Sequence, residues 1–225
     1  MPTSYHTQLN EIVNLIILTN PQSLLDVGVG HGKYGFLARE YLELWDGRTD
    51  GYRLRKRRIV GIELIESFLT PVHHYAYDHI HIGNAVDVVP SLSETYDLAL
   101  LIDVIEHLDH QAGANLLANL SRIARNVIVS TPLSVKFHEP GEMDLFESPP
   151  HVSEWTRECF KGFEGAFFVP NPSSVICYFG QDAAAVRKQL ELARTRRLKA
   201  KVYHYLPFLV PLAKLRRKLL GRSAS

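Results

Sequence analysis

Glycines and acidic side chains stand where apolar segments of this sequence end. The segment SLLDV at 23–27 contains Asp26 and leads into a glycine-rich loop with Gly28, Gly30, Gly32 and Gly35. Glycine permits backbone conformations and close approaches that a Cβ would forbid, and such a loop before a helix favours an anionic or polar ligand. The spacing also matches the dinucleotide fingerprint, so other residues must decide which ligand the loop holds.

Three later apolar segments also end in polar or acidic residues, namely Glu63, Asn84 (followed by Ala85) and Asp103. In an open parallel sheet, ligands bind outside the carboxyl ends of the strands, so we expect these side chains to share one rim. Carboxylates on that rim would repel a pyrophosphate. They favour a ligand with hydroxyls, amines and a positive centre.

The elements that position these residues alternate along the chain. We predict strands over 23–27, 58–63, 79–85, 95–103 and 126–132, then a closing antiparallel pair over 166–170 and 174–180. Predicted helices lie at about 4–19, 33–45, 65–77 (limited by Pro71) and 110–124 (capped by Asp109), with a short one after Thr156. This alternation indicates an α/β fold with a doubly wound, mostly parallel seven-stranded sheet and an antiparallel last strand.

Length and composition limit the class of protein. A chain of 225 residues that is 46% hydrophobic can bury a good core as one α/β domain with extras. Its two cysteines offer neither a disulfide framework nor a zinc cluster. The N-terminus lacks a basic region and predicts an amphipathic helix rather than a signal peptide, so we expect a cytoplasmic protein.

Charge is divided unevenly between two parts of the chain. Residues 183–225 carry twelve Lys and Arg against one acid, a net charge of +11, whereas residues 1–182 carry a net −10. We therefore predict a domain over 1–182 and a basic, helical or amphipathic extension over 183–225. Such a block marks an interaction surface or a solvated helix face.

Four stretches in chain order, LLDVGVGHGKYG, IVGIE, GNA and YDLALLIDVIEHL, resemble the motifs of class I S-adenosylmethionine-dependent methyltransferases. The resemblance covers roughly residues 20–180. STP at 130–132 and HVSEWTRECF at 151–160 also resemble the subset that includes ubiquinone-biosynthesis-type O-methyltransferases and their small-molecule relatives. The resemblance implies the Rossmann-like methyltransferase fold and S-adenosyl-L-methionine as cofactor.

The resemblance also assigns roles to single residues. Asp26 corresponds to the acid that orders the glycine loop and interacts with the methionine end of the cofactor, and Asp103 borders that end and the substrate cleft. Gly28, Gly30 and Gly32 would let the backbone approach the cofactor. Glu63 corresponds to the acid that accepts hydrogen bonds from both ribose hydroxyls, a role that suits two acceptor oxygens.

The adenine contact is less closely matched. Asn84, followed by Ala85, stands where many family members have an aspartate that faces the adenine amino group. An amide oxygen can still accept that N–H, and Asp87 is a substitute nearby.

Methyl transfer is an in-line displacement, which depends on positioning two reactants and excluding water. An oxygen acceptor also benefits from a general base, for which His107 and then His151 are the candidates. Asp103, Glu106, His107 and His110 could meet a divalent ion, but the motif works without metal in most relatives, so we predict no metal. The segment 131–156 is long and rich in aromatic residues, and we predict that it is a substrate lid.

These residues favour methyl transfer to a small-molecule, glycan or lipid-linked acceptor, most simply at oxygen. The alternatives are a nicotinamide-dependent oxidoreductase that uses the glycine loop and a non-catalytic protein of the same fold that binds the cofactor. No Asn/Asp-Pro-Pro-Tyr/Phe run follows the fourth predicted strand, so methylation of base amines in nucleic acid is not expected.

The C-terminal extension contains a largely apolar stretch at 202–213, followed at once by the basic cluster of residues 214–218. Twelve residues are too few to span a bilayer. Apolar anchors beside a basic cluster favour peripheral attachment to an anionic membrane through residues 202–225, at its inner surface. The alternatives are packing on the catalytic domain and a homodimer contact.

Overall fold

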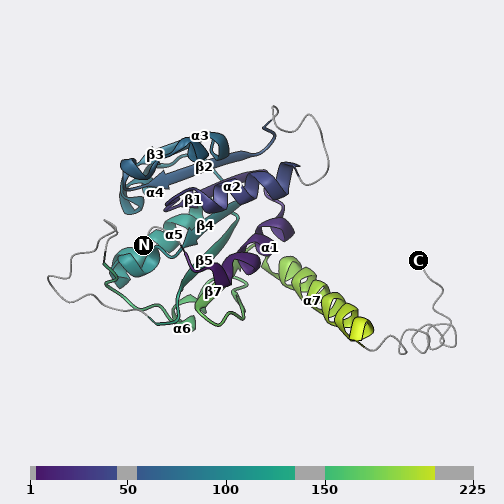
Figure 1. The fold of residues 1–225 in the computed structure, drawn as a ribbon. Coiled ribbons are helices and arrows are strands. Elements are labelled where there is room, and N and C mark those ends of the chain that lie inside the picture. The colour runs from purple at the N-terminus through teal and green to yellow at the C-terminus, as the bar shows by residue number, and fades with distance from the viewer. Residues whose placement is uncertain (1–3, 45–54, 135–149, 206–225) are drawn as a thin grey trace. The chain divides into compact units, whose positions relative to one another are not determined.

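A seven-stranded sheet forms the centre of the computed structural model, which describes residues 4–44, 55–134 and 150–205 (Figure 1). The strands run in the order β3-β2-β1-β4-β5-β7-β6. Strands β1 to β5 pair in parallel, and β7 runs antiparallel to both β5 and β6. Their bounds are Ser23–Val27 (β1), Arg58–Glu63 (β2), His79–Ile82 (β3), Leu98–Ile102 (β4), Asn126–Pro132 (β5), Phe167–Val169 (β6) and Ser174–Gly180 (β7). The predicted α/β fold is confirmed.

Helices connect the strands and cover the sheet. Their bounds are Leu9–Thr19 (α1), Lys33–Arg39 (α2), Pro71–Ala76 (α3), Ala85–Ser91 (α4), His110–Ile123 (α5), Arg157–Phe160 (α6) and Ala183–Tyr205 (α7). Helix α2 packs against α1 and α3, and α4 packs against α5. Three short 3-10 helices at His6–Gln8 (η1), Glu66–Phe68 (η3) and Ile105–His107 (η4) and a π-helix at Glu40–Leu44 (η2) complete the order.

Alternate strand residues face opposite sides of the sheet. Leu25 and Val27 of β1 join the buried cluster that includes side chains of α4 and α5. Asp26, between them, points to the other side and reaches Tyr77 just after α3. Since the central strands are buried on both sides, they are continuous apolar runs in the sequence, and this acid interrupts one.

Two elements differ from the sequence predictions. The predicted helix over 65–77 is present but shorter, because α3 covers only Pro71–Ala76, with η3 before it. Proline lacks a backbone N–H and has a φ that suits the first helical turn, so Pro71 limits this helix by standing at its start. Helix α4 was not predicted. The side chain of Asn84 caps it by accepting a hydrogen bond from the Val86 amide at 3.2 Å.

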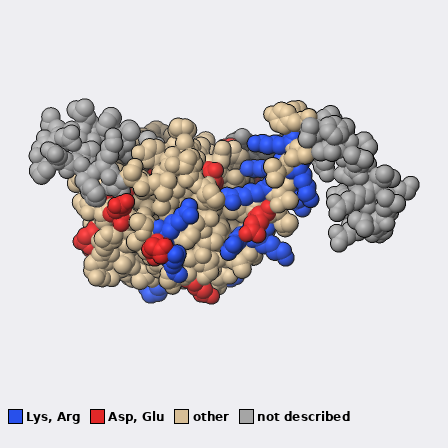
Figure 2. Space-filling view, turned by 90° about the horizontal axis from the view of Figure 1, so that it is seen from below, with Lys and Arg blue, Asp and Glu red and all other residues tan. Residues whose placement is uncertain are grey.

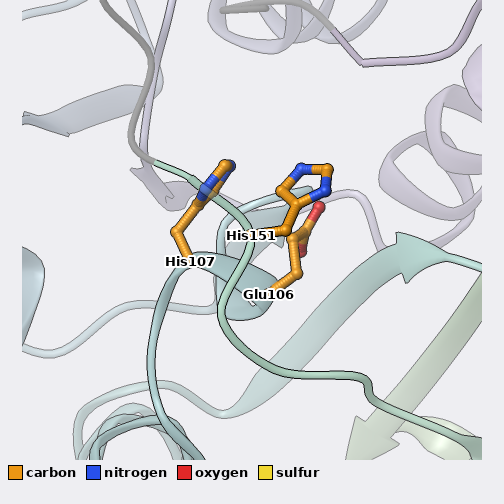
Figure 3. Close-up of side chains that lie close together, drawn as sticks. All are labelled: Glu106, His107 and His151. Carbon is orange, nitrogen blue, oxygen red and sulfur yellow. The ribbon is translucent and has the colours of Figure 1, made fainter. Parts of the chain in front are cut away.

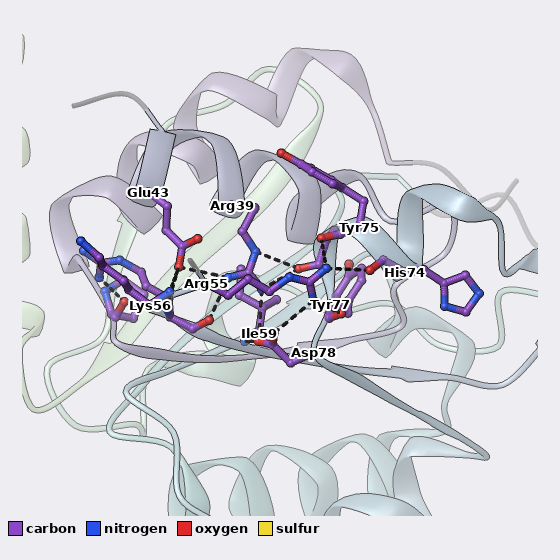
Figure 4. A network of polar contacts seen from close by, with 12 residues as sticks. Arg39, Glu43, Arg55, Lys56, Ile59, His74, Tyr75, Tyr77 and Asp78 are labelled. Atoms are coloured by element: carbon purple, nitrogen blue, oxygen red, sulfur yellow. Dashed lines mark hydrogen bonds and ion pairs between the residues drawn. The ribbon is translucent and has the colours of Figure 1, made fainter. Parts of the chain in front are cut away.

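A buried arginine ties α2 to the end of α3 and the start of β2 (Figure 4). The Arg39 guanidinium is 3% exposed and donates to the carbonyls of Ala76, at 2.9 Å, and Arg57, at 2.8 Å. It also pairs with the carboxylates of Glu43, at 3.0 Å, and Asp78, at 3.1 Å. Since a buried guanidinium needs partners for its donors, this network fixes the position of α3, whose side chains support the site described below.

The chain divides into two compact units, Met1–Val186 and Arg187–Ser225. The predicted division after residue 182 stays a prediction. Most of the predicted lid (135–149) and most of the apolar stretch (206–213) lie outside the described residues. Within the described ranges, no helix is both long and apolar enough to cross a membrane.

Candidate functional site

A cavity of about 350 Å³ opens at the carboxyl ends of β1, β2 and β4. This is the edge at which ligands bind in open α/β sheets, and the volume lies in the range of small-molecule sites. Among the predicted site residues, those that line it are Gly28, Gly30, Glu63, Asn84, Ala85, Asp103 and His107. The structure therefore brings together residues from four predicted strand ends.

Glu63 links the glycine loop to the end of β2. One carboxylate oxygen accepts the amide of Gly30 at 2.8 Å, and the other accepts the amide of Ile65 at 3.0 Å. The residue is only 6% exposed, yet it borders the cavity. Each carboxylate oxygen has more than one acceptor position, so both can accept a further hydrogen bond from a ligand diol.

Gly28 is required by its conformation and by its neighbour. Its φ is +77°, in the left-handed region that favours glycine, and an added Cβ would lie 2.4 Å from Val104 Cγ2. The loop can therefore turn toward the cavity only without a side chain at this position.

Asp26 lies beneath the loop rather than in the cavity. It is 2% exposed and accepts a hydrogen bond from the Tyr77 hydroxyl at 2.5 Å. The same hydroxyl accepts the amide of Gly35 at 3.2 Å, and a Cβ on Gly35 would lie 2.1 Å from the Tyr77 ring. Tyr77 thus ties Asp26 to the glycine loop. Asp26 does not line the cavity, and its predicted contact with the methionine end of a cofactor stays a prediction.

Burial raises the pKa of Asp26 to about 7. The hydrogen bond from Tyr77 opposes this shift, and the charge of Glu63 adds to it. Asp26 therefore changes its protonation state near neutral pH, beneath the glycine loop.

The imidazole of His73 supports the loop from α3. Its Nδ1 accepts the Thr70 amide at 2.9 Å, so Nε2 carries the proton and donates to the Gly30 carbonyl at 2.9 Å. The ring also packs 3.3 Å from the position that a Cβ on Gly32 would take. Gly32, which has a φ of +80°, caps α2 and does not line the cavity. His73 and Tyr77 could not be identified from the sequence, because they follow an apolar strand but belong to no motif.

Asp103 occupies a strained position at the end of β4. Its φ is +53°, although it is not glycine, and such residues persist only where the surroundings hold them. Its carboxylate accepts hydrogen bonds from Gln8 Nε2 at 2.6 Å and Ser130 Oγ at 2.9 Å. Burial raises its pKa, and these hydrogen bonds and the charge of Lys33 oppose the shift.

The N-terminal segment closes one side of the cavity. Lys33 Nζ donates to the Ser4 carbonyl at 3.0 Å, and the Tyr34 hydroxyl lies 3.1 Å from Ser4 Oγ. All three residues line the cavity. In the described part of the chain, Lys33 is the one lysine or arginine of that lining, and burial lowers its pKa.

His107 and His151, the two predicted bases, lie together although they are far apart in sequence. Their ring centroids are 4.7 Å apart, and His107 lines the cavity whereas His151 does not. Glu106 completes a cluster with them (Figure 3). Burial raises the pKa of the Glu106 carboxyl to about 8, and the charge of Asp103 adds to the shift. His110, which we had grouped with these residues, is exposed on α5 and lies outside the cluster.

Comparison with solved structures identifies the fold. The methyltransferase domain of bacterial CtHen1 aligns with a TM-score of 0.51 and 20% identity, over 78% of this chain and 98% of that one. A SAM-dependent methyltransferase from Archaeoglobus fulgidus aligns with a TM-score of 0.51 and 14% identity, over 71% and 86% of the two chains. Magnesium protoporphyrin IX methyltransferase (ChlM) from Synechocystis PCC 6803, solved with bound SAM, aligns with a TM-score of 0.51 and 13% identity, over 78% and 80%.

The chain thus has the α/β fold of S-adenosylmethionine-dependent methyltransferases, as predicted. No protein-family model matches the sequence, and no curated protein matches it.

Proposed function

We propose that this protein transfers a methyl group from S-adenosylmethionine to an oxygen of a small-molecule, glycan or lipid-linked acceptor. The observation that carries the proposal is the cavity itself, in which Glu63 and Asp103 face the glycine loop. Glu63 would accept the ribose hydroxyls, and Asn84 would face the adenine. The assignment to the ubiquinone-biosynthesis-type subset rests on the STP and HVSEWTRECF stretches alone.

The electrostatics of the cavity fit a sulfonium cofactor. The carboxylate of Asp103 would face the methionine end, where it favours both the sulfonium and the amino group. Lys33, close enough for its charge to act on Asp103, would pair with the methionine carboxylate. The zwitterionic methionine end of the cofactor would thus lie between one negative side chain, Asp103, and one positive side chain, Lys33.

The sheet also argues against the nicotinamide alternative. Dinucleotide-binding folds of the Rossmann type have the strand order 3-2-1-4-5-6. Here β7 is inserted between β5 and β6 and runs antiparallel to both. The topology therefore favours S-adenosylmethionine although the glycine spacing permits either cofactor.

An oxygen acceptor must lose a proton when its oxygen bonds to the methyl carbon and the carbon–sulfur bond breaks. His107 is the predicted base on the cavity wall, with His151 beside it. The acceptor would enter past the predicted lid over 131–156, whose central part lies outside the described residues.

A membrane contact accompanies this proposal. Lysine and arginine side chains gather along α7 (Figure 2), at residues 187, 188, 194, 196, 197, 199 and 201. An anionic membrane surface attracts such a segment, which would add to the predicted attachment through residues 202–225, and a lipid-linked acceptor would be reached there.

Calorimetric titration with S-adenosylhomocysteine, S-adenosylmethionine and NAD tests the proposed cofactor. We expect S-adenosylhomocysteine and S-adenosylmethionine to bind and NAD not to bind. Glu63→Gln should weaken S-adenosylhomocysteine binding by roughly tenfold or more, because hydrogen bonds to charged groups contribute about 1.5–3 kcal/mol. Glu66→Gln, a matched change of an exposed acid on η3, should leave the affinity unchanged. Binding of NAD alone would overturn the proposal.

A further inference from the structure

Three side chains near the cavity form a cluster of metal-ligand types. Glu106 and His107 belong to η4, and His151 comes from the described C-terminal part of the predicted lid over 131–156. One ligand atom of each lies within 4.8 Å of the other two. Figure 3 shows the His151 ring above the Glu106 carboxylate, with His107 beside them.

Glu106 is the part of this cluster that the fold leaves unexplained. The residue is 1% exposed, and neither carboxyl oxygen has a hydrogen-bond partner within 3.5 Å among the described residues, although the Thr131 hydroxyl is close enough to lower its pKa. A buried carboxyl group without a good partner is costly, and such groups are normally paired or bound to a metal. No part of the proposed cofactor site uses this side chain.

The backbone holds His151 at the cluster. The amides of Val152 and Ser153 both donate to the Glu106 carbonyl, at 2.9 and 3.2 Å. The Trp155 indole donates to Ser153 Oγ at 2.8 Å, and its ring lies over Gly113 of α5, where a Cβ would be 2.4 Å away. The segment that carries His151 is therefore fixed against η4 and α5.

His107 is oriented in the way that metal ligands usually are. Its Nδ1 lies 3.1 Å from the carbonyl oxygen of Pro150. A carbonyl only accepts, so Nδ1 carries the proton and Nε2 has the lone pair that a metal needs. A backbone carbonyl on the other ring nitrogen is a common way to fix the tautomer of a metal-ligating histidine.

We propose that Glu106, His107 and His151 form a binding site for a first-row divalent cation at the edge of the cavity. One carboxylate and two imidazoles suit Mn²⁺, Fe²⁺ or Zn²⁺. Ligand atoms at about 2.1 Å from a metal lie about 3–3.5 Å apart, and the atoms of this set, which lie within 4.8 Å of one another, need only small side-chain movements to reach that spacing. Asp103 would not be a further ligand of the cation, because its carboxylate already accepts hydrogen bonds from Gln8 and Ser130.

Such a cation would deepen the proposed function, and this step rests on that proposal. Three protein ligands leave open positions, and His107 lines the cavity. An acceptor oxygen bound there would have a lowered pKa and a fixed position. The two histidines would then act as ligands, in place of the predicted role as bases.

The test is metal binding by the full-length protein after treatment with a chelator. Mn²⁺ is titrated, and the free ion is followed by electron paramagnetic resonance. We expect one Mn²⁺ per chain, at least about tenfold weaker binding in Glu106→Gln and in His151→Asn, and no change in His74→Asn. The last variant is the matched control, since His74 is exposed on α3 and lies outside the cluster.

The proposal is overturned if the wild-type protein binds no Mn²⁺ or Zn²⁺ at millimolar concentration, or if both cluster variants bind like wild type. Thermal unfolding without metal shows whether each variant is folded. If Glu106→Gln does not fold, the metal affinity of His151→Asn decides the test. Titration of S-adenosylhomocysteine in the presence of chelator separates the two proposals, because the cofactor site should bind its ligand whether or not the cation binds.

Discussion

The Nε2 atom of His73 lies 2.9 Å from the carbonyl oxygen of Gly30 and donates a hydrogen bond to it. The amide of the same glycine donates to Glu63. The peptide units on both sides of Gly30 are therefore held by side chains from outside the loop. These two hydrogen bonds restrict a glycine-rich segment that would otherwise have much conformational freedom.

Replacing His73 should weaken both the fold and ligand binding. His73→Phe keeps an aromatic ring, although a larger one, but leaves the Gly30 carbonyl and the Thr70 amide without their partners, which costs about 1–3 kcal/mol for each buried group. We expect a lower free energy of unfolding in urea and weaker S-adenosylhomocysteine binding. His74→Phe, at the exposed neighbouring position, should change neither. Equal affinities in wild type and His73→Phe would show that the hydrogen bond does not shape the site.

The buried Asp26 should make stability depend on pH. Its ordinary pKa is 3.8, and the folded protein raises it to about 7. Between these values the folded chain holds a proton that the unfolded chain releases, so the free energy of unfolding falls as pH rises through this window and is level above it. Urea unfolding from pH 5 to 8 should show a steeper fall for wild type than for Asp26→Asn. Parallel curves for the two proteins would contradict this prediction.

The sequence predicts the sheet well because its central strands are buried on both sides and appear as apolar runs ended by acids and glycines. It also places Glu63 and Asp103 at one edge, since parallel strands align their carboxyl ends. The contacts that support the loop could not be predicted from the sequence. Tyr77 contacts Asp26 and His73 contacts Gly30, and each pair is too far apart in sequence for a local pattern to indicate it. The short helix that begins at Pro71 positions both His73 and Tyr77.

The proximity of His107 to His151 could not be predicted for the same reason. Both were candidates by residue type, but the segment over 131–156, which carries His151, has no periodicity that fixes its path. The backbone hydrogen bonds from Val152 and Ser153 to Glu106 bring them together, and these depend on main-chain groups that all residue types except proline share.

Gly28→Ala should separate backbone strain from side-chain crowding. A non-glycine residue in the left-handed region costs roughly 1–2 kcal/mol, and the new methyl group would also collide with Val104. We expect reduced stability and weaker S-adenosylhomocysteine binding, with partial recovery of stability in the Gly28→Ala/Val104→Ala double variant. Gly162→Ala, where nothing lies within 4 Å of the added Cβ, is the control. Full recovery in the double variant would show that the φ of +77° is not a constraint.

The C-terminal extension should bind anionic membranes through charge and apolar contact together. Sedimentation with vesicles of phosphatidylglycerol and of phosphatidylcholine measures this, and we expect binding only to the anionic vesicles. The bound fraction should fall as salt rises from 0.05 to 0.5 M, because roughly 1 kcal/mol per basic residue near the surface is screened within a Debye length. Deleting residues 202–225 should abolish binding, and Arg194→Glu/Arg197→Glu should weaken it while the apolar stretch is kept. Binding that survives the deletion, or that does not depend on lipid charge, would reject the membrane proposal. If the molecular mass of the full chain in solution increases with concentration and that of the deletion variant does not, the dimer contact is favoured instead.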